Sequence, residues 1–521
     1  MTAETIVETQ RTRPTAPRAE SAGTQRGFLT QPRYPTLYQI NTRAYMTDLA
    51  RSLNRTVTLD DVPDSALDEW QARGFDWIWL LSVWSTGAVG QRISRQNAEW
   101  RREFQSTLKD LTEEDIAGSG FAITAYTVSP SLGGDAALAR LRERLRRRGL
   151  RLMLDFVPNH TAVDNPWVNQ RPEVYVAGSE SDLSRAPGNY LRMGGGAQEG
   201  RILAHGRDPY FPGWPDTLQL DYSNPSTIEV MSEQLARIGE RCDGVRCDMA
   251  MLVLPDVFER TWGRRALPFW PDAIRRVRAR SPGFLFMAEV YWDLEWTMMQ
   301  QGFDFAYDKR LYDRLRDGHA RPVRDHLRAG LDYQDHLARF MENHDEPRAC
   351  AAFPEGLREA AAIVTFLTPG LRFFHEGQFD GRTVRVSPHL VRRPYEVPNP
   401  RVRDFYERLS PILRRDEVRN GSWQLLEAMP AWDGNWTNDC LIISWWSDRA
   451  GRSLLVPVNY AGNQSQCYVR LPGNGLNGRI VVLRDLTGPS WYVRNGDELI
   501  SKGLYLDMPA WGYNVFEVST Q

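Results

Sequence analysis

The stretch Asp135–Val157 reads DAALARLRERLRRRGLRLMLDFV and holds one complete helix–strand unit. Its first part is amphipathic, with apolar residues at helical spacing, and it closes at Gly149, because glycine favours the position just after a helix. The run that follows, Arg151–Val157, is short and apolar, as is typical of a buried strand. A helix that leads directly into a buried strand indicates an α/β fold with a parallel sheet.

The same alternation of buried strands and amphipathic helices continues on both sides of this stretch. Eight candidate strands occur, namely Thr36–Ile40, Asp76–Leu81, Arg151–Val157, Asp243–Asp248, Phe284–Glu289, Phe303–Tyr307, Leu337–Glu342 and Leu371–Phe374. Most of them are followed by a helical pattern, such as Thr227–Glu240 and Glu355–Phe366. Eight strand–helix units predict an α/β fold of the (β/α)8 TIM barrel type.

Changes in composition divide the chain further. Residues 1–30 are polar and are expected to form a disordered leader, ahead of a barrel domain over residues 31–415. Within that domain, residues 161–224 are rich in Gly, Pro and Trp and lack periodicity, which predicts an insertion after strand 3. Residues 416–521 carry short alternating runs separated by Asn-Gly, Asp-Gly and Pro-Gly, which predicts a C-terminal antiparallel β-sandwich. The segment Ser82–Gly120 is interpreted as an extended loop with a short helix.

The composition argues against several classes of protein. Lys and Arg number 64 against 66 Asp and Glu, so a net charge of -2 offers no basic field for nucleic acid. The five cysteines are scattered and form no CxxC pair, which disfavours a disulfide framework or a zinc site. No run approaches the roughly 18 apolar residues of a membrane span. The polar N-terminus has no secretory signal pattern, so we expect a cytoplasmic protein, with no indication of its oligomeric state.

Carboxylate side chains stand at the ends of four predicted strands. In a barrel of this type the chemistry lies at the C-terminal ends of the strands. The third strand runs into Asp155–His160, the fourth ends at Asp248, the fifth at Glu289, and the seventh is followed by Asp345. We therefore expect these groups to face one common mouth.

Grouped carboxylates suit the cleavage of glycosidic bonds. That reaction needs one carboxylate as a nucleophile or stabiliser and one protonated carboxylic acid for the leaving oxygen. A separation near 5 Å gives retention of configuration, and adjacent strands lie roughly 4.8 Å apart. Asp248 and Glu289 end neighbouring strands, so the pattern favours a retaining reaction.

Four motifs carry a resemblance to a known family. They are LDFVPNHT (Leu154–Thr161), GVRCDMAM (Gly244–Met251), FMAEVY (Phe286–Tyr291) and FMENHDE (Phe340–Glu346). In this order they resemble the conserved regions of the α-amylase family, glycoside hydrolase family thirteen. The resemblance implies that Asp248 is the nucleophile, Glu289 the general acid/base and Asp345 the transition-state stabiliser.

The same resemblance implies the substrate-binding residues, which are Asp155, His160, Arg246, His344 and Phe121. Phe121 follows Gly120 where the family usually has a Tyr, so the ring platform for the sugar keeps its stacking and loses a hydroxyl. The local sequence agrees with the two main roles. Glu289 ends an apolar run, which should raise its pKa, whereas an ion pair with Arg246 should keep Asp248 charged.

Further comparison with the family pattern bears on cofactors, on a metal and on the acceptor. No cofactor is required by the predicted reaction, and a structural calcium is possible because Asn159 matches a calcium ligand of some members. The usual Pro-Asp-Leu-Asn segment has only a loose counterpart in Trp214–Tyr222. After the nucleophile, Met249–Leu252 is apolar where many members have polar residues, which leans towards an acceptor other than water.

The sequence predicts an enzyme acting on α-glucosidic bonds of oligosaccharides or glucans, by hydrolysis or by transfer to a sugar, through a covalent glycosyl-aspartate. The alternative is a catalytically silent carbohydrate-binding protein on the same fold. Intact Asp248, Glu289 and Asp345 argue against this alternative. A metal-dependent hydrolase would need several histidines at the strand ends, and only His160 and His344 are present there.

Overall fold

The protein was analysed as a computed structural model that describes residues 31–194, 198–473 and 475–521. Eight parallel strands close into a barrel in the order β1-β14-β13-β12-β11-β10-β5-β2. Their bounds are β1 Thr36–Asn41, β2 Trp77–Leu81, β5 Arg151–Phe156, β10 Gly244–Cys247, β11 Leu285–Ala288, β12 Phe305–Tyr307, β13 Leu337–Phe340 and β14 Leu371–His375. The predicted (β/α)8 barrel is confirmed, and its eight strands are those expected from the apolar runs.

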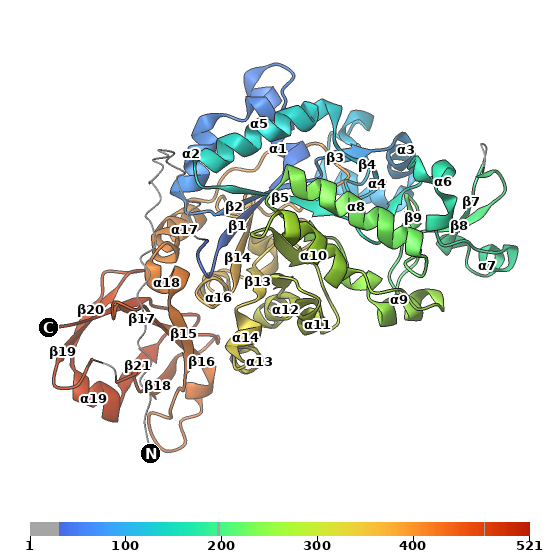
Figure 1. Cartoon of the computed structure of the whole chain (residues 1–521). Helices are drawn as coiled ribbons and strands as arrows, with labels where there is room; N and C mark the ends of the chain where they lie inside the picture. Colours follow the sequence, from blue (N-terminus) through green and yellow to red (C-terminus); the bar gives the residue numbers. More distant parts are fainter. Residues whose placement is uncertain (1–30, 195–197, 474) are drawn as a thin grey trace, which may run out of the picture. The chain divides into compact units, whose positions relative to one another are not determined.

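Helices surround these strands, as Figure 1 shows for α5, α8, α10 and α16. The main helices are α1 Thr42–Leu53, α2 Asp64–Ala72, α5 Gly134–Arg147, α8 Pro225–Arg241, α9 Pro255–Trp262, α10 Trp270–Arg280, α11 Glu295–Gln300, α12 Lys309–Asp317, α13 Ala320–Leu327, α14 Leu331–Gln334, α15 Ala349–Ala352, α16 Leu357–Phe366 and α17 Pro400–Leu413. The predicted amphipathic stripe of α5 packs inward through Leu138, Leu141 and Leu145. Gly149 follows with a φ of 75°, a left-handed conformation that costs glycine little.

The segment between β2 and β5 is more regular than its sequence suggested. It contains β3 Trp84–Thr86 paired with β4 Ile123–Val128, and the helices α3 Ala88–Gln96 and α4 Ala98–Thr107. The expected extended loop with one short helix is therefore wrong. Asn97 explains the second helix, because its side chain accepts hydrogen bonds from the backbone N–H groups of Glu99 and Trp100.

The segment after β5 begins with β6 His160–Ala162 and returns to the barrel after β9 Thr217–Gln219. These two strands pair antiparallel, with His160 opposite Gln219. Between them lie α6 Trp167–Gln170, α7 Glu180–Arg185, β7 Tyr190–Arg192 and β8 Ile202–Ala204. The pairing of β6 with β9 ties the base of the predicted insertion to the end of the third barrel strand.

The C-terminal part follows the short helix α18 Asp416–Asn420. A six-stranded sheet has the order β15-β16-β17-β22-β19-β20, and β18 pairs with β21. The elements are β15 Ser422–Leu426, β16 Leu441–Ser447, β17 Ser453–Asn459, β18 Ser465–Val469, β19 Ile480–Asp485, β20 Trp491–Asn495, α19 Gly496–Ser501, β21 Leu504–Met508 and β22 Phe516–Thr520. All its strand pairs are antiparallel, as predicted.

Two further expectations from the sequence concern the leader and membrane spans. The predicted leader, residues 1–30, lies outside the described residues. Among the helices that the structure describes, none combines the length and the apolar character needed to cross a membrane.

Candidate active site

The three predicted catalytic carboxylates follow the carboxyl ends of barrel strands. Asp248 comes directly after β10, Glu289 directly after β11, and Asp345 lies in the turn after β13. Because β10 pairs with β11 in parallel, with Cys247 opposite Ala288, Asp248 and Glu289 leave the sheet side by side. The barrel topology alone therefore brings together groups that lie far apart in the sequence.

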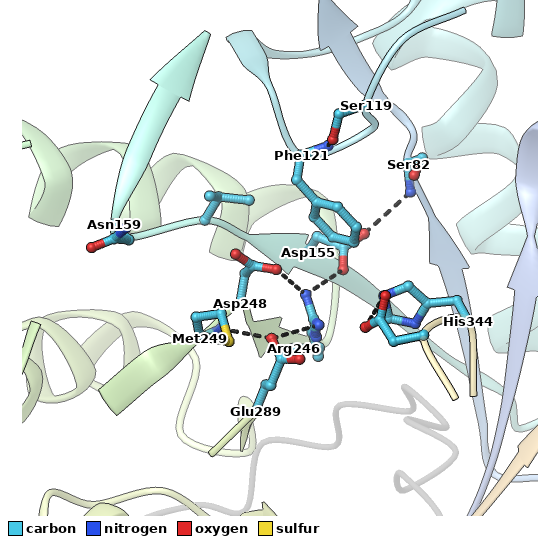
Figure 2. A network of polar contacts seen from close by, with 12 residues as sticks. Ser82, Ser119, Phe121, Asp155, Asn159, Arg246, Asp248, Met249, Glu289 and His344 are labelled. Carbon is cyan, nitrogen blue, oxygen red and sulfur yellow. Dashed lines mark hydrogen bonds and ion pairs between the residues drawn. The ribbon is translucent and has the colours of Figure 1, made fainter. Parts of the chain in front are cut away.

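Arg246 lies at the centre of the site (Figure 2). It is 1% exposed, and its guanidinium donates from Nη1 to Oδ1 of Asp248 and from Nη2 to Oε2 of Glu289, both at 2.7 Å. Nη1 also lies 3.7 Å from Oδ1 of Asp155, which is opposite Arg246 in the strand register. One cation thus holds two carboxyl groups of neighbouring strands at one place.

Glu289 receives two further hydrogen bonds. The backbone N–H of Met249 donates to Oε2 at 2.7 Å, and the Tyr291 hydroxyl donates to Oε1 at 2.9 Å. Met249 has a φ of 41°, a left-handed conformation unusual for a residue with a side chain. Backbone strain of this kind is found at functional sites where the surroundings impose it, and here it accompanies the bond to Glu289.

The protonation of the two carboxyls is set by burial and by Arg246. Burial raises the pKa of Asp248 and the pKa of Glu289, and the guanidinium of Arg246 opposes the rise in both. Asp248 and Asp345 raise the pKa of Glu289 further by like-charge repulsion. The pKa of Glu289 is raised, as expected. Arg246, however, does not favour the charged form of Asp248 alone, because it binds both carboxyls at the same distance.

Asp155 lies beneath this network. It is 1% exposed, and its Oδ2 accepts the backbone N–H of Ser82 at 3.2 Å. Burial raises the pKa of Asp155 to about 7, and the charge of Arg246 opposes that rise. The side chain approaches the guanidinium from the side of β5, at 3.7 Å.

His344 and Asp345 form a pair at the opening of the site. Nε2 of His344 lies 3.1 Å from Oδ2 of Asp345, whose side chain is 44% exposed. The Gln39 side-chain amide nitrogen lies 2.8 Å from Nδ1 and donates to it, which leaves the ring proton on Nε2. Burial lowers the pKa of His344 well below its ordinary value, so the ring is neutral.

His160 and Phe121 complete the predicted set. Burial lowers the pKa of His160 to about 3, and the ring of Trp214 lies 5.2 Å from it. The Phe121 ring centroid lies 5.5 Å from that of His344 and 5.2 Å from the Arg246 guanidinium carbon. Phe121 therefore covers the same cation that binds the two carboxyls (Figure 2).

The interpretation of Met249–Leu252 as an apolar acceptor side is wrong for most of its residues. Ala250, Met251 and Leu252 belong to a buried turn of 3-10 helix, Ala250–Val253, and pack into the core. A short helix turns these side chains inward, and the sequence run alone gave no direction. Their apolar character reflects packing and carries no information about the acceptor.

Exposed aromatic side chains near the site come from elsewhere. Tyr210 and Phe211, on the loop between β8 and β9, are 58% and 67% exposed. The Tyr210 ring contacts Trp292 edge-on, with centroids 5.0 Å apart, and Trp292 lies three residues beyond Glu289. Trp292 has a φ of 62°, so the loop after β11 is held in a left-handed conformation at this contact.

The surroundings of Asn159 do not fit a cation. Its Oδ1 and its backbone carbonyl oxygen each accept a hydrogen bond, at 2.9 Å, from the side-chain nitrogen of Gln219. Calcium prefers six to eight oxygen ligands, with carboxylates among them. Within the described ranges, no three His, Cys, Asp or Glu side chains converge as metal ligands.

Sequence reasoning missed several residues that contact the predicted set. Tyr291 could have been found, because it closes the motif FMAEVY and lies two residues after Glu289. Gln39 gave no signal, because its partner His344 lies 305 positions away in the chain. The structure thus adds Tyr291 and Gln39 to the site.

Comparison with known proteins gives the same assignment as the motifs. The family model described as the α-amylase catalytic domain matches residues 74–182. α-Amylase MalA of Haloarcula japonica is 27% identical over 293 residues, which cover 53% of this chain and 39% of that protein. Maltase 1 of Drosophila virilis is 22% identical over 326 residues, 52% of this chain and 51% of that protein.

Over these regions the chain is similar to proteins of the α-amylase family. It spans only about two fifths to one half of these two relatives. Solved structures of α-amylase type share its fold over nearly the whole chain. The maltogenic α-amylase AmyB of Thermotoga neapolitana has a TM-score of 0.65 at 19% identity, with 93% of this chain and 98% of that chain covered. The trehalose-6-phosphate hydrolase of Bacillus licheniformis has a TM-score of 0.60 at 14% identity, with coverages of 94% and 99%.

Proposed function

We propose that this protein is a retaining enzyme of the α-amylase type that cleaves α-glucosidic bonds of oligosaccharides or glucans and passes the glycosyl group to water or to a sugar. The observation that carries the proposal is the guanidinium of Arg246, which binds Asp248 and Glu289 together at 2.7 Å each. Two carboxyls held by one cation suit the close spacing, about 5 Å, that a retaining reaction needs.

In the first step, Glu289 donates its proton to the glycosidic oxygen. The Asp248 carboxylate attacks the anomeric carbon, the bond to the leaving sugar breaks, and a glycosyl ester of Asp248 forms. The raised pKa of Glu289 favours the protonated form that this step needs. Binding of substrate between the two carboxyls replaces part of their contact with Arg246.

In the second step, Glu289 acts as a base. It takes a proton from water or from a sugar hydroxyl, whose oxygen attacks the anomeric carbon and releases Asp248. Two displacements at the same carbon retain its configuration. The exposed rings of Tyr210 and Phe211 offer flat surfaces for a sugar acceptor next to Trp292, which supports transfer alongside hydrolysis.

The remaining residues bind and orient the sugar. Asp345, exposed at the opening and paired with neutral His344, would bind hydroxyls of the distorted ring. Phe121 would stack on the ring, His160 would hydrogen-bond it, and Asp155 would brace Arg246. No step requires a cofactor.

The proposal is tested by product analysis on maltooligosaccharides. We expect new products whose anomeric configuration, measured by NMR before mutarotation, is α. Incubation with a slow fluorinated α-glucosyl donor should add one glycosyl mass to the peptide that contains Asp248. Longer oligosaccharides without free glucose would identify transfer as the main reaction.

Two results would contradict the proposal. Release of the β-anomer would show inversion, because a single displacement changes the configuration. Binding of α-glucans without turnover of any α-glucan, disaccharide or activated α-glucoside would favour the silent carbohydrate-binding protein instead.

A further inference from the structure

Gln219, the last residue of β9, lies at the junction between the β6–β9 pair and the barrel. Its side chain is fully buried, with 0% exposed. Its amide nitrogen lies within hydrogen-bonding distance of three oxygens: the Asn159 carbonyl at 2.9 Å, Asn159 Oδ1 at 2.9 Å and the Leu220 carbonyl at 3.1 Å. Asn159 is itself 1% exposed, so three oxygen acceptors converge on one buried point.

The hydrogen-bond partners fix the orientation of this amide. A side-chain NH2 group donates, whereas an amide oxygen turned to the same place would meet three other acceptors and be repelled. In the present orientation the amide oxygen faces the backbone N–H of Arg207, at 3.4 Å. A group with partial positive charge therefore occupies the point where the three oxygens meet.

Backbone carbonyl and Asn side-chain oxygens are also among the usual ligands of calcium. A cation at this point would need the Gln219 nitrogen to leave, and it would then have fewer oxygens than the six to eight it prefers. The amide satisfies the same acceptors with neutral hydrogen bonds. Its position is secured by the strand register, since Gln219 lies opposite His160 in the β6–β9 pair.

We propose that the Gln219 amide takes the place of a structural cation at this junction, so that the attachment of the β6–β9 segment to the barrel is independent of calcium. The consequence reaches the sugar-binding side, because His160 follows Asn159 directly and its Nδ1 lies 3.4 Å from the Asn159 amide nitrogen. The inference concerns stability and metal binding. It does not depend on the proposed activity.

The test compares Gln219→Asp with Gln219→Asn, two side chains of the same shape that differ in charge. Thermal unfolding is measured for the full chain in excess calcium and in excess chelator, and calcium binding is followed by titration calorimetry. For the wild-type protein we expect the same Tm in both conditions and no calcium binding at this junction. Gln219→Asn should lower Tm equally in both conditions, because the shorter amide no longer reaches the three oxygens.

Gln219→Asp should behave differently from its neutral control. The shorter side chain leaves room for an ion and turns a carboxylate towards the three oxygens across that space. Without calcium, the uncompensated negative charge should make this variant less stable than Gln219→Asn. Calcium should raise its Tm by several degrees and give a binding isotherm that Gln219→Asn lacks. A wild-type Tm that rises with calcium or falls with chelator would overturn the proposal. If Gln219→Asp cannot be produced folded, the wild-type comparison and Gln219→Asn still decide it.

Discussion

Arg246 is the side chain on which the electrostatics of the site depend. It is buried, and it forms ion pairs with Asp248 and Glu289 at 2.7 Å and lies 3.7 Å from Asp155. Three carboxyls around one guanidinium cannot all be ionised at low cost, because only one positive charge compensates them. This arrangement favours a proton on one of the three carboxyls, which suits a general acid.

The different roles proposed for the two carboxyls predict different responses to the leaving group. Glu289→Gln removes the acid, so kcat on maltooligosaccharides should fall by about 10²–10⁴. Release of fluoride from α-glucosyl fluoride, which needs no protonation, should be much less affected in its first turnover. Asp248→Asn should abolish both reactions, because it removes the nucleophile. Equal losses of fluoride release in the two variants would contradict the assignment.

Tyr291 gives a prediction of pH dependence. Its hydroxyl donates to Oε1 of Glu289, and a hydrogen bond to a carboxylate favours the charged form and lowers its pKa. Tyr291→Phe removes that bond, so the pKa of Glu289 should rise. Because the protonated acid is the active form, activity is lost as pH rises through this pKa, and the alkaline limb of the kcat/KM profile should move upward by about one unit or less.

The acidic limb serves as the control for Tyr291→Phe. A role in folding alone would lower activity equally at every pH and leave both limbs in place. A shift of the alkaline limb to lower pH would show that the hydroxyl stabilises the protonated form of Glu289, opposite to the expectation.

Among the elements, the two strands β10 and β11 matter most for the site. Their parallel register places Cys247 opposite Ala288, so the next residues of both strands, Asp248 and Glu289, leave the sheet together. The backbone N–H of Ala250 also donates to the Glu289 carbonyl at 3.0 Å, which ties the turn after β10 to the end of β11. The backbone register thus places the two carboxyl-bearing residues next to each other, whatever rotamers their side chains adopt.

The helices α3 and α4 give a prediction about stability. Asn97 ends α3 and caps α4 through hydrogen bonds from the N–H groups of Glu99 and Trp100, at 3.1 and 3.0 Å. Asn97→Ala should lower the free energy of unfolding by about 1 kcal/mol, since the first turn of α4 loses its acceptor. Urea unfolding measures the change, and Asn97→Ser, which keeps a capping oxygen, should remain near the wild type. Equal stability of the two variants would show that the cap contributes nothing.

In the whole molecule, one part of the C-terminal strands packs into the hydrophobic core of the barrel, while another part forms a core of its own. Trp446, Val456 and Tyr460 belong to the same buried cluster as the barrel residues. Hydrogen bonds add to this contact, from Trp446 Nε1 to the Leu367 carbonyl at 2.9 Å and from the Tyr460 hydroxyl to the Leu315 carbonyl at 2.7 Å. We therefore expect both parts to unfold as one cooperative unit.

Trp446→Phe tests this coupling. The variant loses the indole donor and leaves the buried Leu367 carbonyl without it, so the free energy of unfolding should fall by about 1–3 kcal/mol. Calorimetry should still show a single transition, at lower temperature. Trp445→Phe is the control, because Trp445 packs in the separate core of the C-terminal strands. Two resolved transitions in the wild-type protein would contradict the shared core.

Much of this architecture was predictable from sequence because it depends on local patterns. Buried strands of parallel barrels appear as short apolar runs, and all eight were found within about two residues at each end. The strand β20 is exposed at every position, so it offers no apolar run to recognise.

The sequence by itself determined the barrel, the order of its strands along the chain and the carboxylates at their ends, because side-chain periodicity and residue type are local properties. Only the tertiary structure decided the contacts that govern the chemistry. Arg246 binds Glu289 as well as Asp248, and the side chains of Ala250–Val253 are buried in the core. Gln39 hydrogen-bonds His344, and Gln219 hydrogen-bonds Asn159. These outcomes depend on the directions of side chains from distant segments, which packing fixes and sequence spacing does not.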